Sequence, residues 1–186
     1  MTTSVVALTA TVYTFEIELS DVDRSVYETL SFKAAQQPSE TNEYLLTRVL
    51  AYCMEYTEGI GFSRGLAEPD EPAVAVRDLT GVVKVWIEIG NPDAARLHKA
   101  SKASPRAVVY THKDPAQLLR QLAGERIHKR ETIEVRAVDR ELLAGLAGRL
   151  DRRMKLALSF TEGHVYVTFA DGDTIDGPIT RHALTG

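Results

Sequence analysis

A carboxylate interrupts a run of the sequence that is otherwise typical of a buried strand, VVKVWIEIGNPD from Val82 to Asp93. An unpaired carboxylate buried in a sheet costs several kcal/mol, so Glu88 is expected to lie beside a cation or a metal ion. Alternatively, its face is solvated, or Glu88 pairs with Lys84 along the strand. Alternation at period two gives one face of branched aliphatic residues and a second face made of Lys84, Trp86, Glu88 and Gly90.

The residues after this strand predict a helix rich in cations. Asn91 is expected to cap it and Pro92 to take its first position, with the helix ending near Ser104. Standard rises place Lys99 about 10 Å into the helix and Glu88 about 7 Å before the turn, so the two side chains can meet. Such a helix suits an anionic ligand such as a nucleic-acid backbone, although a basic face is more often simply solvated. The cations are Arg96, His98, Lys99 and Lys102, with Arg106 just beyond.

The bulk composition limits the number of domains, the cellular location and the partners to be expected. With 186 residues the chain fits a single domain spanning 1–186. No apolar run is long enough for a membrane span, and the first residues lack the features of a signal peptide, so a cytoplasmic location is expected. Cys53 is the only cysteine, which excludes an intrachain disulfide. A net charge of −4 argues against a dedicated non-specific DNA binder, so any nucleic-acid role must depend on a local patch.

Hydrophobic periodicity predicts a mixed α/β fold with a central sheet and helices on its faces. The chain is expected to open with a β-hairpin, continue with a helix that Ser39 caps, and place a buried parallel strand after the basic helix. The predicted strands are 5–19, 27–34, 73–77, 82–89, 107–111, 132–138, 154–160 and 164–169, and the predicted helices are 39–56, 92–104, 115–123 and 139–150.

Several charged residues could together carry chemistry. Carboxylates that converge at a strand end are the ligands Mg²⁺ prefers, and a nearby lysine can orient an attacking water or stabilise charge on a phosphate. Glu43 lies near the edge of the apolar face of the 39–56 helix, so it can point towards the sheet. Alternatively, it is an acid of the first turn that interacts only with the positive end of the helix dipole. The candidate set is Glu43, Asp70, Glu71, Glu88 and Lys99.

These residues lie in motifs that resemble the YaeQ family, whose fold is a variation on the PD-(D/E)XK nuclease superfamily. The motifs are PSETNEYLLTRVLAY from Pro38, FSRGL from Phe62, DEP from Asp70, VWIEIGNPD from Val85 and RLHKAS from Arg96. The resemblance implies a restriction-endonuclease-like αβββαβ core at about 38–112, with an N-terminal β-hairpin and a C-terminal strand-helix-hairpin extension. It also implies hydrolysis of phosphodiester bonds with Mg²⁺ or Mn²⁺.

The sequence departs from the superfamily motif at two positions. Gly90 stands where the motif lysine belongs, so that role could pass only to a displaced lysine, Lys99 or in second place Lys102. Pro72 is followed by Ala73 instead of aspartate, so the first metal ligand must come from a neighbouring acid: Glu71, Asp70 or Asp78.

Two functions follow as hypotheses. In the first, the chain is a nuclease of DNA or RNA in which Glu88 and Glu71 bind the metal, Glu43 supports it and Lys99 positions the nucleophile. The phosphates would then be held by Arg96, Lys102 and Arg106. In the second, the chain is a catalytically silent module that uses the nuclease fold to bind a nucleic acid or a protein partner.

Overall fold

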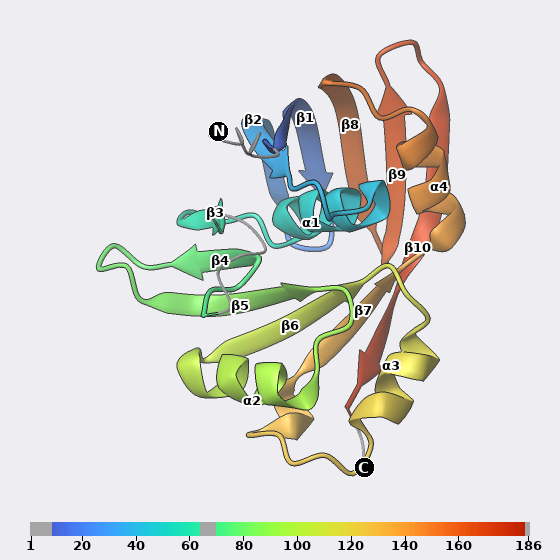
Figure 1. Cartoon of the computed structure of the whole chain (residues 1–186). Coiled ribbons are helices and arrows are strands. Elements are labelled where there is room, and N and C mark those ends of the chain that lie inside the picture. Colours follow the sequence, from blue (N-terminus) through green and yellow to red (C-terminus); the bar gives the residue numbers. More distant parts are fainter. Residues whose placement is uncertain (1–8, 64–69, 185–186) are drawn as a thin grey trace, which may run out of the picture.

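The computed structural model describes residues 9–63 and 70–184. Within these ranges the chain forms four α-helices, a short 3-10 helix and ten strands that join in one sheet (Figure 1). The helices are α1 (Asn42–Met54), α2 (Ala94–Ala103), α3 (Pro115–Leu122) and α4 (Arg140–Gly148), and the 3-10 helix is η1 (Arg130–Thr132). The strands are β1 (Thr11–Asp21), β2 (Val26–Gln36), β3 (Ile60–Phe62), β4 (Val74–Arg77), β5 (Val83–Ile89), β6 (Arg106–Thr111), β7 (Glu134–Val138), β8 (Arg153–Thr161), β9 (His164–Phe169) and β10 (Thr174–Ala183).

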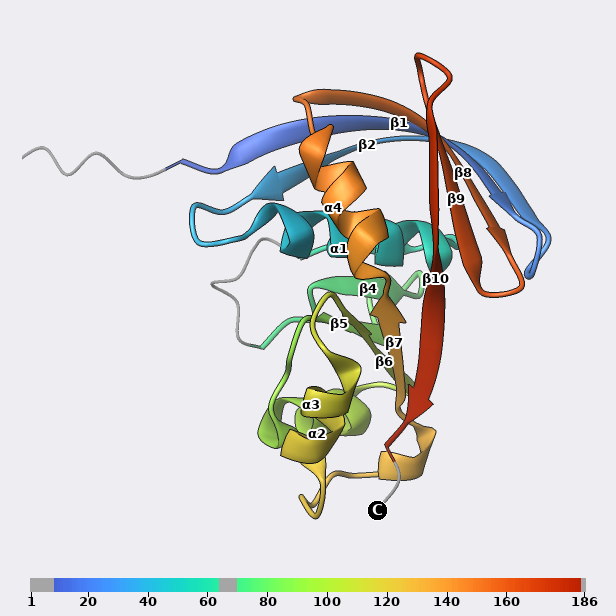
Figure 2. The same cartoon turned by 90° about the vertical axis from the view of Figure 1, so that its right-hand side faces the viewer.

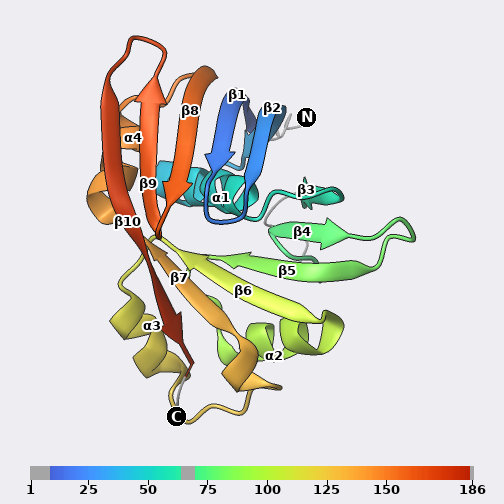
Figure 3. The same cartoon turned by 180° about the vertical axis from the view of Figure 1, so that it is seen from behind.

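The sheet has the strand order β2-β1-β8-β9-β10-β7-β6-β5-β4-β3. Strand β10 joins its two halves, because residues 174–178 pair with β9 and residues 179–183 pair with β7. Figure 3 shows β10 running from the upper half into the lower half, and Figure 2 shows how strongly the sheet curves. The parallel strands β5, β6 and β7 therefore end at the same edge, close to the middle of the molecule.

The helices divide the core between the two faces of the sheet. The apolar face of α1 packs with α4 against the upper strands, and its inner side also contacts β5 and β6. The opposite face of the lower half is covered by α2 and α3, which bury Trp86, Val109 and Val135. Strand β5 is consequently covered on both faces, and this explains why its second half is buried throughout.

The mixed fold, the opening β-hairpin, the four helices and the parallel pairing of β5 with β6 are confirmed. Two predicted caps are wrong: Thr41 caps α1 instead of Ser39, and Asp93 caps α2 instead of Asn91, with side-chain oxygens that accept N–H groups of the first turn. The final strand β10 and the parallel pairing of β1 with β8 were not predicted. Residues 5–8 of the predicted first strand lie outside the described residues, and so do residues 64–66 of the FSRGL motif.

The sequence predicts that no segment crosses a membrane. Among the residues that the structure describes, no helix has the length and apolar character that crossing a bilayer requires.

Candidate functional site at the end of strand β5

Glu88 is the second-to-last residue of β5, and it is only 6% exposed. Its Oε1 atom accepts two hydrogen bonds, from Trp86 Nε1–H at 2.6 Å and from Arg96 Nε–H at 2.8 Å. Trp86 is two residues away on the same face of the strand, as the alternation predicts, and Arg96 reaches over from α2. The prediction that the buried carboxylate lies beside a cation is therefore correct, and the cation is Arg96.

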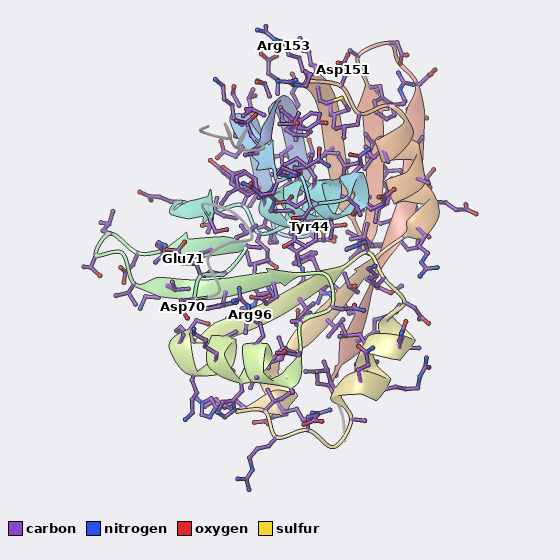
Figure 4. The ribbon with its side chains drawn as sticks, in the orientation of Figure 1. Tyr44, Asp70, Glu71, Arg96, Asp151 and Arg153 are labelled. Carbon is purple, nitrogen blue, oxygen red and sulfur yellow. The ribbon has the colours of Figure 1, made fainter. Side chains whose placement is uncertain are left out.

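The guanidinium of Arg96 is held from three directions. Its Nε–H binds Glu88, its Nη2–H donates to the carbonyl oxygen of Glu71 at 2.5 Å, and its Cζ lies 5.4 Å from the centroid of the Trp86 ring. Its own backbone N–H donates to the capping carboxylate of Asp93, which fixes the start of α2. Figure 4 shows Arg96 near the start of α2, with Glu71 and Asp70 beside it. Arg96 is thus oriented before any ligand arrives.

The burial of Glu88 alters its acidity. Loss of hydration raises the pKa of this carboxyl above its ordinary value, and the hydrogen bond from Trp86 and the charge of Arg96 offset the effect only in part. A buried carboxyl with a raised pKa beside an arginine is typical of a functional site, although structural ion pairs show the same pattern.

Lys99 contacts Asp70 instead of Glu88. The pair lies at the surface, where the Lys99 ammonium, chiefly through its hydrogen bond, lowers the pKa of the Asp70 carboxyl. The prediction that Lys99 meets Glu88 is wrong because Arg96, one helical turn earlier on the same face, already occupies the carboxylate. The resulting surface has two acid–base pairs side by side, Glu88 with Arg96 and Asp70 with Lys99.

The other predicted site residues are dispersed. Glu71 lines a cavity of about 410 Å³ together with residues of β3 and β4, Arg77 among them. Glu43 lines a different cavity, of about 350 Å³, with His112 beyond the end of β6. Of the five candidates for chemistry, Glu88 and the backbone of Glu71 contact Arg96, and Asp70 lies near enough for the charge of Arg96 to help lower its pKa.

The residues predicted to contact phosphate have different surroundings in the structure. Arg106 makes a two-pronged ion pair with Glu55, with N–O distances of 2.7 and 3.2 Å, and Glu55 also accepts a hydrogen bond from Tyr110. Arg106 is therefore committed to the fold. Lys102 lies exposed in the last turn of α2.

Three residues near this site were not singled out from the sequence. Glu40 and Arg48 form a buried ion pair at 3.1 Å, with exposed fractions of 8% and 3%. Glu40 Oε1 and Arg48 Nε are buried without a hydrogen-bond partner. Tyr44 lies between this pair and Glu88: burial, together with the charges of Glu40 and Glu88, raises its pKa to about 12. The signal in the sequence was an arginine among the apolar positions of a helix.

Among the residues that the structure describes, the acids predicted to bind Mg²⁺ do not converge on one site. Metal binding requires two or three free carboxylate oxygens that converge. Glu88 Oε1 is taken by two donors, Asp70 is paired with Lys99, and Glu71 lines a separate cavity. Among residues 9–63 and 70–184, no three His, Cys, Asp or Glu side chains are placed to share a metal ion.

The protein is a mixed α+β protein. It has one curved sheet of parallel and antiparallel strands with helices on both faces, and a Glu88–Arg96 ion pair at the end of β5. The family model described as "YaeQ protein" matches residues 6–176 of the chain. "Uncharacterized protein YaeQ" of Escherichia coli (strain K12) is 31% identical over 163 residues, which cover 87% of this chain and 90% of that protein. The chain belongs to the YaeQ family, as its motifs indicated.

Two solved structures have the same fold. The crystal structure of YaeQ protein from Pseudomonas syringae has a TM-score of 0.81 and 33% identity, over 95% of this chain and 97% of that one. The crystal structure of YaeQ protein from Xanthomonas axonopodis pv. citri has a TM-score of 0.84 and 31% identity, over 95% of this chain and 100% of that one.

Proposed function

We propose that this chain is a nucleic-acid-binding module that contacts the phosphodiester backbone through the surface around Arg96 and the exposed side of α2. The observation that carries the proposal is the fixed guanidinium of Arg96, held by Glu88, the Glu71 carbonyl and the face of Trp86. An arginine oriented in advance loses less conformational freedom when its charge meets a phosphate. Lys99 and Lys102 on the same helix add positive charge.

The test is a titration of fluorescent single-stranded DNA, duplex DNA and RNA at several salt concentrations. Backbone contacts predict a linear fall of log affinity with log salt, with a slope of about −0.9 per contact on duplex DNA. Arg96→Lys keeps the charge but cannot donate to Glu88 and to the Glu71 carbonyl from one planar group, so the charge loses its fixed orientation, and we expect binding to weaken about tenfold. Arg153→Lys is the matched control, because Figure 4 places Arg153 at the far end of the molecule. Equal affinities for the two variants, or no affinity in the wild-type protein, would refute the proposal.

A second candidate is metal-dependent cleavage of phosphodiester bonds. It is favoured by the element order α1-β3-β4-β5-α2-β6, which is the αβββαβ order that the resemblance implies, and by a buried carboxylate at the end of the third of these strands. Against it stands the donor set, in which Glu88 and Asp70 are already paired with cations.

Calorimetry with Mg²⁺ and Mn²⁺ separates the two candidates. Metal binding that is lost in Glu88→Ala, together with cleavage of a nucleic acid, would replace the binding module by a nuclease. Nucleic-acid binding without metal-dependent cleavage would support the module.

A further inference from the structure

A second cluster of charged side chains lies outside the Glu88 site, around the cavity of about 350 Å³ that contains Glu43. The walls of this cavity come from three places in the chain: the start of α1, the segment that follows β6 and the first turns of α4. Figure 2 shows α4 rising from the end of β7, with the start of α3 below it. The cavity thus lies beyond the carboxyl ends of β6 and β7, the edge at which open α/β sheets commonly bind ligands.

Three charged groups line this cavity without a described partner. Within residues 9–63 and 70–184, the side chains of Glu43, Lys113 and Arg140 make no ion pair or hydrogen bond with one another or with a neighbour. Lys113 and Arg140 also line an adjoining cavity of about 540 Å³, so both cations lie where the two cavities meet. Charged groups gathered in a hollow without pairing have the arrangement expected for binding an outside ligand.

His112 supplies a fourth polar group. Its Nδ1 atom is buried without a hydrogen-bond partner, and its ring makes an edge contact with Tyr44, with centroids 6.0 Å apart. Burial, followed by the charges of Lys113 and Arg140, lowers the pKa of the imidazole, while Glu43 acts in the opposite direction. The lowered pKa favours the neutral ring, whose Nε2 atom can either donate or accept a hydrogen bond, while the buried Nδ1 is out of reach of a ligand.

The two helix starts favour an anion at the junction of the cavities. Helices α3 and α4 both begin there, and their N-terminal ends carry partial positive charge. The nearby carboxylates of Asp114 and Asp139 are engaged as caps, since they accept the N–H groups of Ala116 and Leu142 at 3.0 Å. They lie on the side of the larger cavity, which leaves Lys113 and Arg140 as the cations that face the smaller one.

We propose that this cavity binds a small sugar phosphate, with the phosphate between Lys113 and Arg140 and the sugar hydroxyls on Glu43 and His112. A carboxylate that accepts hydrogen bonds from vicinal hydroxyls is a common mode of ribose recognition, and a volume of about 350 Å³ lies in the range of small-molecule sites. The site shares no residue with the proposed nucleic-acid surface and does not depend on it.

The experiment is calorimetry on the full chain with ribose 5-phosphate, adenosine monophosphate, inorganic phosphate and ribose. We expect saturable binding of ribose 5-phosphate, weaker binding of inorganic phosphate and none of ribose. Comparable binding of adenosine monophosphate would identify a nucleotide as the source of the sugar phosphate, and its exclusion would identify the free sugar phosphate. Lys113→Met and Arg140→Met should each weaken binding about tenfold. Arg153→Met removes an equal charge at the far end of the molecule and should leave the affinity unchanged.

A measurement on the unaltered protein protects the test against variants that fail to fold. Ribose 5-phosphate should shift the side-chain resonances of His112 in NMR spectra. His128 should remain unaffected, because it precedes the start of β7, at the opposite end of that strand from the cavity, and contacts His98 of α2. Absence of binding, an unperturbed His112, or equal loss of affinity in Arg153→Met would each overturn the proposal.

Discussion

Arg96 reaches back eight residues to Glu88, and this contact, at 2.8 Å, fixes the position of α2 relative to the end of β5. The carboxylate is almost fully buried, whereas about a quarter of the arginine side chain is exposed. The pair thus joins a core residue to the surface. Any change to one partner alters both the stability of the core and the orientation of the surface guanidinium.

Removing Arg96 should destabilise the protein more than removing the charge of Glu88. Arg96→Met leaves a buried carboxylate without its cation, and we expect a loss of about 2–3 kcal/mol, below the 3–5 kcal/mol of a fully buried pair. In the Glu88→Gln background the same substitution should cost less than about 1 kcal/mol, because the amide can still accept the Trp86 N–H. Urea unfolding of the two single variants and the double variant measures this coupling. Additive losses would show that the pair is not coupled.

Lys99→Met is the natural control for that cycle. Its partner Asp70 is exposed, and surface ion pairs contribute little. No measurable change in the free energy of unfolding is expected for this variant.

The choice of Arg96 over Lys99 shows where prediction from the sequence ended. Strand and helix rises correctly indicated that a cation of α2 could reach Glu88. They did not select between two residues one helical turn apart, because that selection depends on how α2, through its own Leu97, packs into the part of the core that contains Trp86.

The missed strand β10 has a similar cause. The sequence TIDGPITRHA has glycine and proline at its centre, which normally argues against a strand. Gly177 and Pro178 lie at the point where β10 leaves β9 and begins to pair with β7. Gly177 also lies so close to α4 that an added Cβ would be 2.9 Å from Asp139 Cβ. Gly177 and Pro178 therefore mark the junction of the two halves of the sheet, and only the tertiary structure reveals this junction.

Gly90 should resist any side chain, including the lysine that the nuclease motif places there. Its φ angle is +91°, in the region that residues with a Cβ rarely adopt, although a Cβ would meet only ordinary contacts at 3.7 Å with Tyr44 and His112. Gly90→Ala should therefore cost about 1–3 kcal/mol through backbone strain. Gly61→Ala is the control, since Gly61 has no positive φ and no atom within 4 Å of an added Cβ. Thermal or urea unfolding of both variants gives the comparison, and equal stabilities would exclude the strain.

The Glu55 network should make stability depend on pH in the acid range. Burial raises the pKa of Glu55, but hydrogen bonds and charge from Arg106, with further help from Tyr110 and Arg136, outweigh it and lower the pKa overall. A lowered pKa in the folded state means that the unfolded state binds the proton more readily. The stabilisation is thus complete above the ordinary value of 4.5 and is lost as the pH falls through the folded value.

Glu55→Gln tests this dependence. At pH 7 the variant should be about 3 kcal/mol less stable, because two arginines lose their buried partner. The gap from the wild-type protein should narrow as urea unfolding is repeated towards pH 3. The exposed Glu131→Gln serves as the control. A gap that stays constant with pH would contradict the assigned role of the Glu55 charge.

Tyr44 should report the electrostatics between the two buried ion pairs. Burial is the main reason that its pKa rises from 10.0 to about 12, and the charges of Glu40 and Glu88 raise it further while Arg48 and Arg96 lower it. The difference in phenolate absorbance between the wild-type protein and Tyr44→Phe, recorded directly after a jump to alkaline pH, should therefore have its midpoint near 12. In concentrated urea the same difference curve should return to about 10, the ordinary value. Glu40→Gln should lower the midpoint in the folded protein, because a negative charge that opposes ionisation is removed. A midpoint that Glu40→Gln leaves unchanged would mean that the charge of Glu40 does not contribute to the acidity of Tyr44.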